Sequence, residues 1–277
     1  MSIINPTVPN VLGSINPASL PVISGTASLS LALFDENWTA LLNMFNIGGL
    51  PSNPQSGTLA FDTNKLLWIY GNGAWNQITG ILKVKVQVFN SSGTYTPSSG
   101  LLYAIVEVVS GGGGGGAGDA TPHSGGGGGG GGYARAILTA ATIGASQTVT
   151  IGNGGAGGIY GGIGAAPGGT TSFGSYLSAT GGGGGNPIIG GLGGVGLGGS
   201  VNCSGSPGAN EMGTSNIAGD GGSSMMGGGG KGSYGTTNAM QGGNYGGGGG
   251  GGGAVASYGN GNNGAPGIVI VTEFKTQ

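Results

Sequence analysis

The sequence contains few side chains that could carry out acid–base or metal chemistry. It has one histidine, His123, one cysteine, Cys203, and eight carboxylates among 277 residues. A glycosidase needs two carboxylates facing one groove, and the nearest pair in the glycine-rich part of the chain is Glu211 and Asp220. No pattern aligns those two side chains, and a lone histidine supplies too few ligands for a zinc centre. We therefore predict that the protein is not an enzyme and that it holds no metal or cofactor.

Two glycine-rich motifs resemble nucleotide-binding sequences but lack essential features. G-x-G-x-x-G spacings arise by chance in a chain with 75 glycines, and no βαβ unit followed by a ribose-binding acidic residue surrounds them. The segment GGGGKGS resembles a phosphate-binding loop, but Gly232 follows Lys231 where a magnesium-binding Ser or Thr is required. Six Lys and Arg residues without a basic cluster are too few to neutralise a phosphate backbone. The sequence thus predicts no nucleic-acid partner.

Membrane and export signals are also missing from the sequence. No apolar stretch reaches the 18 or so residues that a membrane-spanning helix needs, so we expect no membrane insertion. Residues 1–21 have no basic segment and contain several prolines, unlike a signal peptide. The single Cys203 cannot form an internal disulfide. We expect a protein made in the cytoplasm and soluble there.

Glycine divides the chain into two parts. Residues 1–110 hold ten glycines, and residues 111–267 hold the other 65. Uninterrupted glycine runs occupy 111–116, 125–132, 181–185, 227–230 and 246–253. A run of glycine has no side chain to bury, so only backbone hydrogen bonds can order it. Polyproline II-type helices without Cβ atoms can approach closely enough to bond to one another. We predict such polyglycine II rods here, the alternative being flexible linkers.

The segments between the glycine runs are typical of β-strands. Strands are predicted at about 58–62, 66–70 and 74–78, with Asn72-Gly73 as a tight turn. KVKVQVF at 83–89 alternates strictly, which indicates a half-exposed strand. The expected fold is mainly β, a glycine-rich sandwich of polyglycine II helices framed by β-strands. The expected domains are an extended segment 1–26, a helix-plus-β-meander module 27–85 and a glycine-rich domain 86–277.

The first module also contains the pattern of a short amphipathic helix. Asp35 is a candidate N-cap and Gly48 a candidate C-terminal stop. A helix of about three turns with one apolar face is marginal alone, so it is predicted to dock onto the following strands or onto copies of the chain. The apolar residues recur at helical spacing and are the docking or oligomer candidates: Phe34, Trp38, Leu41, Leu42 and Phe45.

Five segments follow one another in the second part of the chain: SGTYTPSSGLLYAIVEVVSGGGGGG, GGGGGGYARAILTA, QTVTIGNGGAGG, GGTTSFGSYLSATGGGGG and GAPGIVIVTEF. Their succession resembles the glycine-rich domain at the tips of tailed-bacteriophage tail fibres. The resemblance covers roughly residues 90–275. In the first part, GTLAFDTNKLLWIYGNGAWNQI is similar to a short β-module of phage fibre proteins.

The resemblance implies a virion fibre protein that acts as a host-receptor-binding adhesin. The rods would form a rigid scaffold, and the segments between the runs would contact a bacterial surface protein or glycan. Those segments are 119–124, 159–167, 186–189, 202–217, 231–245 and 254–263. The side chains there and beside them that are candidates for receptor contact are His123, Tyr160, Tyr234, Tyr245, Tyr258, Met225 and Met226. For the tyrosines and methionines, the alternative is a role in closing the ends of the rods.

The resemblance further implies the partners and the location. Other fibre or tail proteins would bind the N-terminal part, the chain would form a homotrimer, and it would reside in the virion as a tail or capsid-attached fibre. A purely structural fibre or decoration protein without receptor binding is the main alternative. A bacterial surface adhesin or an animal receptor ectodomain would require an export signal, which we do not find.

Overall fold

The computed structural model describes most of the chain after residue 49 and divides the chain between Ile81 and Leu82 into two compact units. The described residues are 50, 54, 56–57, 59–62, 67–78, 82–119, 123–160, 164–213, 217–234, 239–254 and 259–276. The segment 1–26 and the predicted docking helix with Phe34, Trp38, Leu41, Leu42 and Phe45 lie outside these residues.

The described part of the first unit is an antiparallel meander. Strands β1 (Leu59–Phe61), β2 (Leu67–Gly71) and β3 (Ala74–Gln77) form one sheet in that order. Asn72 and Gly73 join β2 to β3 with φ values of 54° and 76°, as a two-residue hairpin turn with two left-handed positions requires. These strands and their turn agree with the sequence prediction.

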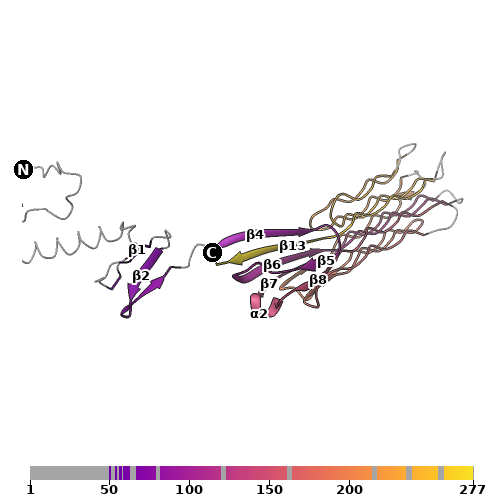
Figure 1. Ribbon diagram of the computed structural model, residues 1–277. Helices are drawn as coiled ribbons and strands as arrows, with labels where there is room; N and C mark the ends of the chain where they lie inside the picture. The colour runs from indigo at the N-terminus through magenta and orange to yellow at the C-terminus, as the bar shows by residue number, and fades with distance from the viewer. Residues whose placement is uncertain are drawn as a thin grey trace, which may run out of the picture. The chain divides into compact units, whose positions relative to one another are not determined.

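Two five-stranded antiparallel sheets form the base of the second unit. One has the order β11-β10-β9-β8-β5 and the other β12-β7-β6-β13-β4. Figure 1 shows β4, β13, β6 and β7 lying side by side, with the C-terminal strand β13 between β4 and β6. The strands are β4 (Lys83–Phe89), β5 (Gly93–Tyr95), β6 (Leu101–Val109), β7 (Tyr133–Thr139), β8 (Gln147–Thr150), β9 (Thr171–Phe173), β10 (Leu177–Ala179), β11 (Gly196–Leu197), β12 (Val201–Cys203) and β13 (Ile268–Lys275). One short helix, α2 (Ala140–Ile143), follows β7.

A side-chain core joins the two sheets. Val106 and Val271 from one sheet and Phe173 and Leu177 from the other belong to a single buried cluster. The ring of Tyr95 lies 5.3 Å from that of Phe173, centroid to centroid. The sandwich is therefore held together in the ordinary way, by apolar side chains removed from water.

Beyond the strands, the glycine-rich segments form rods that run side by side (Figure 1). Their hydrogen bonds repeat every three residues. Gly128, Gly129 and Gly130 donate to three different segments, through the carbonyls of Gly249, Gly183 and Ser206. Three residues after Gly128, Gly131 returns to the first of these segments at Gly246, and Gly132 likewise returns to the second at Thr180. Three residues per turn without internal hydrogen bonds is the geometry of a polyglycine II helix.

Three of the rods are enclosed by other rods on every side, and we call them the central rods. They comprise residues 110–118, 124–132 and 246–253, all of them buried. A Cβ atom added to Gly113, Gly128 or Gly249 would lie well under 3.0 Å from a backbone carbonyl of a neighbouring rod. The mainly β fold with a polyglycine II bundle framed by strands is thus confirmed.

The other rods are built from interrupted glycine segments and lie on the outside of the bundle. In the rod 189–196, Ile189, Leu192 and Val195 are exposed while the glycines between them face other rods. In the rod 259–266, Asn260, Asn263 and Pro266 are exposed at the same spacing. Because a rod has three residues per turn, one free side allows every third residue to carry a side chain. Much of the predicted loops 202–217, 231–245 and 254–263 is therefore rod.

Candidate functional site

The turns farthest from the sandwich meet at one end of the bundle, which we call the distal end. The rod that leaves β6 at Ser110 reaches Gly118, and the chain returns through 124–132 to β7, so Asp119 and His123 lie at the far end. Backbone hydrogen bonds link it to the other turns: Gly118 donates to Gly259, and Ile188 donates to Ser124. The distal end includes the described residues around 119, 123–124, 159–160, 186–189, 211–213, 217, 234 and 259.

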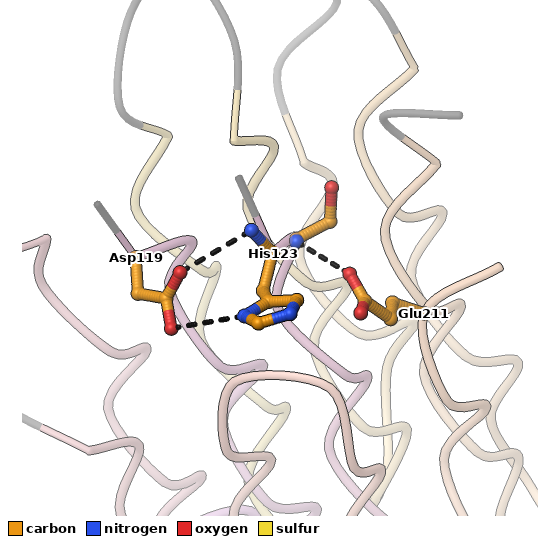
Figure 2. Close-up of polar contacts among 4 residues, drawn as sticks. Asp119, His123 and Glu211 are labelled. Atoms are coloured by element: carbon orange, nitrogen blue, oxygen red, sulfur yellow. Dashed lines mark hydrogen bonds and ion pairs between the residues drawn. The ribbon is translucent and has the colours of Figure 1, made fainter. Parts of the chain in front are cut away.

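Asp119 and His123 close the first of these turns (Figure 2). The backbone N–H of His123 donates to Oδ1 of Asp119 at 3.2 Å, and the imidazole Nδ1 lies 3.4 Å from Oδ2. The N–H of Asp119 donates to the carbonyl of His123 at 3.0 Å. This side chain-to-backbone pairing replaces the rod hydrogen bonds that end at the turn. Protonation of the imidazole would convert the contact to an ion pair.

Glu211 ties a second turn to the first (Figure 2). Its Oε2 accepts a hydrogen bond from the backbone N–H of Ser124 at 2.6 Å. Its own N–H donates to the carbonyl of Ile188, so the three turns that contain Ser124, Ile188 and Glu211 are connected. Such connections fix the positions of the turns relative to one another.

Ile188 holds an unusual backbone conformation within this connected group. Its φ is 76°, in the left-handed region that a β-branched residue rarely adopts. Strain of this kind costs on the order of 1–3 kcal/mol and persists where the surroundings impose it. Here the N–H of Ile188 is bonded to Ser124 and its carbonyl to Glu211. The adjoining Pro187 forms an isolated bridge with Gly125.

Large apolar side chains are exposed at the distal end. Met212 is 68% exposed and Tyr234 is 65% exposed. The others are Ile159, Ile188 and Ile189. Their solvent-facing positions, on turns fixed by backbone bonds, give the distal end an apolar surface with two carboxylates, Asp119 and Glu211.

The structure places three of the sequence-predicted contact residues at this end and three elsewhere. His123, Tyr160 and Tyr234 lie at the distal end, and the N–H of Tyr160 donates to Oδ1 of Asn260 there. Tyr258 lies outside the described residues.

Met226 and Tyr245 lie at the opposite end of the rods, beside the sandwich. They pack against a cluster of Val109, Tyr133 and Ile268. The hydroxyl of Ser224 donates to the carbonyl of Tyr245 and holds the two turns together. Met225 belongs to the same turn but is 60% exposed. Met226 and Tyr245 therefore have the plug position that the sequence left open, and we include none of the three in the distal surface.

Sequence patterns did not identify Ile188, Met212 or Glu211 as members of one surface. Ile188 follows one rod, Glu211 and Met212 follow another in a different part of the chain, and only the pairing of the rods brings the two turns together. Part of the signal was present: in GGLGGVG the apolar residues recur every third position, which identifies 189–196 as an outer rod and hence Ile188 as its distal start.

Within the described ranges, no three or more His, Cys, Asp or Glu side chains are grouped so as to hold a metal ion. None of the helices in that part of the chain is both long enough and apolar enough to span a bilayer.

A comparison with protein families shows to which family the chain is similar. The family model of a glycine-rich domain matches residues 88–273. No curated protein matches the chain.

Proposed function

This chain belongs to the glycine-rich domain family, and we propose that it is a virion fibre protein of a tailed bacteriophage that binds a receptor on the host surface through its distal end. The receptor would be a protein or glycan of the bacterial surface. The N-terminal part would attach the chain to other fibre or tail proteins, as a homotrimer in the virion.

One observation carries this proposal: backbone hydrogen bonds hold several exposed apolar turn residues together at one end of a stiff bundle. Binding costs less free energy when the contacting groups are already ordered. In the central rods only the serines at 110 and 124 have side-chain rotamers to lose, because the other residues are glycines and Ala117. The turns can differ in sequence while the rods stay the same, which suits a protein that must recognise changing receptors.

The composition of the distal end fits recognition by surface contact. Tyr234 offers a large contact area with a polar tip and few rotamers to lose, and Met212 is adaptable in shape. The carboxylates of Asp119 and Glu211 are already engaged with backbone N–H groups. They support the turns rather than forming a pair across a groove.

A purely structural fibre protein is the second candidate. The observation that favours it is the apolar stripe of Ile189, Leu192 and Val195 along the side of the bundle. A stripe on the side of a rod is suited to packing against a neighbouring protein in a particle, with no receptor involved.

Binding of the purified full-length chain to cells of the phage's host separates the two candidates. We expect the double variant Met212→Ala and Tyr234→Ala to bind at least about tenfold more weakly, because exposed anchors at an interface centre contribute on the order of 2 kcal/mol each. Leu192→Ala is the matched control, since Leu192 is 78% exposed but lies on the side of the bundle. Equal binding by all three proteins, at unchanged melting temperature, would favour the structural candidate.

A further inference from the structure

The sheet β12-β7-β6-β13-β4 has an outer face that points away from the sandwich core. Strand register arranges its side chains in rows across the sheet. One row contains Val86, Thr272, Ile105 and Ile137, and the next contains Val84, Phe274, Tyr103 and Thr139. The third contains Val88, Ile270, Glu107, Arg135 and Val201. We call these thirteen positions the outer face.

In strand β4 the apolar side chains point outward and the polar ones inward, which is the reverse of the usual arrangement in a sheet with water on one side. Antiparallel sheets of that kind place apolar side chains inward and polar ones outward. In β4, Val84, Val86 and Val88 are 57%, 53% and 51% exposed. The polar residues of β4 point to the sandwich instead: Gln87 donates to Glu273 at 3.0 Å, and Lys85 donates to Ser98 at 2.9 Å. This alternation is favourable if another surface covers the three valines and removes them from water.

The remaining strands carry the apolar surface across the sheet. Ile137 on β7 is 62% exposed, and the rings of Tyr103 and Phe274 stack with centroids 4.7 Å apart. The charged side chains of this face, Glu107 and Arg135, lie opposite each other on β6 and β7. The outer face is thus a broad, mainly apolar surface rather than a scatter of single residues.

The outer face is as large as the apolar patches that often have a function in other proteins. Four strands about 4.8 Å apart, each with about seven residues at 3.3 Å per residue, cover roughly 440 Å² in projection. The largest apolar patch on a monomeric protein is about 300–600 Å² and is often functional. Each partner of a stable complex buries roughly 800 Å², so the outer face would form the central part of such a contact.

The charge of the unit favours another copy of the same chain as the occupant. From Leu82 onward the chain has five basic residues, Lys83, Lys85, Arg135, Lys231 and Lys275. It has five acidic residues there, Glu107, Asp119, Glu211, Asp220 and Glu273, so the net charge is zero. Identical units without net charge do not repel, and low net charge promotes association. Sheets pack face to face about 10 Å apart with their side chains interleaved, so the outer face of a second copy could cover the three valines.

We propose that copies of this chain associate through the outer face, so that Val84, Val86 and Val88 of one copy pack against the same sheet of another. The proposal is independent of receptor binding, because the outer face lies on the sandwich and the receptor contacts lie at the distal end. It adds to the fibre a homomeric contact made by the glycine-rich unit itself.

The test uses the full-length chain with the double substitution Val86→Lys and Ile137→Lys. Both side chains already contact water in the single chain, so lysines leave the fold intact and disfavour only the covered state. Sedimentation equilibrium gives the mass of the assembly. A second readout is the rate of maleimide labelling at Thr272→Cys, in the middle of the face, resolved from Cys203 by peptide mass spectrometry. Leu192→Lys, on the side of the rods, is the matched control.

We expect Thr272→Cys to be labelled at least about tenfold more slowly in the otherwise wild-type chain than with the two lysines. The protection from maleimide labelling should decrease on dilution together with the mass of the assembly. The Leu192→Lys variant should retain both the protection and the mass. Equal labelling rates in the two backgrounds at every concentration would show an uncovered face and overturn the proposal, even if other residues hold copies together. Protection that persists after the mass has fallen to that of a single chain would mean that the occupant belongs to the same chain, which also overturns the proposal.

Discussion

The sandwich and the rods of the second unit are held together by different atoms of the same chain. In the sandwich, Phe173, Leu177, Val106 and Val271 fill a core between two sheets. In the central rods the buried atoms are almost entirely main chain, and from Gly125 to Gly132 every N–H donates to a carbonyl on another segment. A buried side chain stabilises the first region and would disrupt the second. The two regions thus reach close packing in different ways. In the sandwich, side chains fill the space between the sheets, and in the rods the absence of side chains lets the backbones approach one another.

The strongest test of this comparison adds one methyl group to a central rod. We expect Gly128→Ala to destabilise the protein by more than about 3 kcal/mol, the upper end for overpacking, because the new Cβ would lie well under 3.0 Å from the carbonyl of Gly113. That corresponds to a fall in melting temperature of roughly 6–12 °C for a unit of this size. Differential scanning calorimetry measures it.

Gly228→Ala is the control for that substitution. No atom lies within 4 Å of a Cβ at Gly228, so we expect no loss, and a gain of up to about 1 kcal/mol from the stiffer unfolded chain. Equal effects at the two positions would contradict the view that the central rods need bare backbone. Rapid amide exchange throughout 125–132 and 246–253 would contradict it as well.

A moderate effect should appear in the sandwich, where a charge is buried. Glu273 is fully buried on β13, and its Oε1 accepts from the hydroxyl of Tyr95 at 2.7 Å and the N–H of Ser98 at 3.0 Å. Burial alone would raise the pKa of Glu273, but hydrogen bonds from Ser98, Tyr95 and Gln87 outweigh it and hold the pKa below the usual 4.5. Burial and the nearby carboxylate raise the pKa of Tyr95, which keeps its hydroxyl as a donor.

We therefore expect Glu273→Gln to cost about 1.5–3 kcal/mol at neutral pH, the range for hydrogen bonds to a charged group. Because the folded pKa is lowered, the contribution is present above pH 4.5 and is lost as the pH falls through the folded value. The difference between wild type and variant should narrow below pH 4.5 in urea titrations. A constant difference down to pH 3 would mean that the charge of Glu273 contributes nothing. The central rods, which have no titratable side chains, provide no such acid sensitivity.

The smallest effect is expected on the outer rods, where an exposed ion pair joins Lys231 to Asp220 at 2.7 Å. Burial would raise the pKa of Asp220, but the hydrogen bonds from Lys231 and the N–H of Gly232 lower it. We expect Asp220→Asn to cost at most about 0.2–1 kcal/mol, as for exposed pairs. The cost should shrink in about 1 M salt, where the screening length is about 3 Å. A loss comparable to that of Gly128→Ala would mean that side chains, not main chain, hold the rods.

Local patterns predicted much of the fold but not which surfaces meet. Asn72-Gly73 predicts its hairpin because both positions of that turn need a left-handed backbone conformation, which Asn and Gly adopt readily. The alternation in 83–89 identifies β4. The alternation did not reveal that Val86 faces outward, because the inner side of β4 is decided by Glu273, which lies on a strand 186 residues from Gln87 in sequence. The contact between Glu211 and Ser124 was likewise beyond local reasoning, since it depends on the order of the rods.

By itself, the sequence determined that 125–132 and 246–253 can contribute only main chain, so that a bundle of hydrogen-bonded rods is the one way to order them. It also predicted the strands near 58–62, 66–70, 74–78 and 83–89, because alternation and turn residues act over a few positions. Only the tertiary structure decided which rods are central, which side of β4 is exposed and which turns share the distal end. The reason is that glycine specifies the absence of a side chain and not the identity of a neighbour. Each rod acquires its neighbours only when the whole bundle assembles, because every buried N–H must then donate to a carbonyl of another rod.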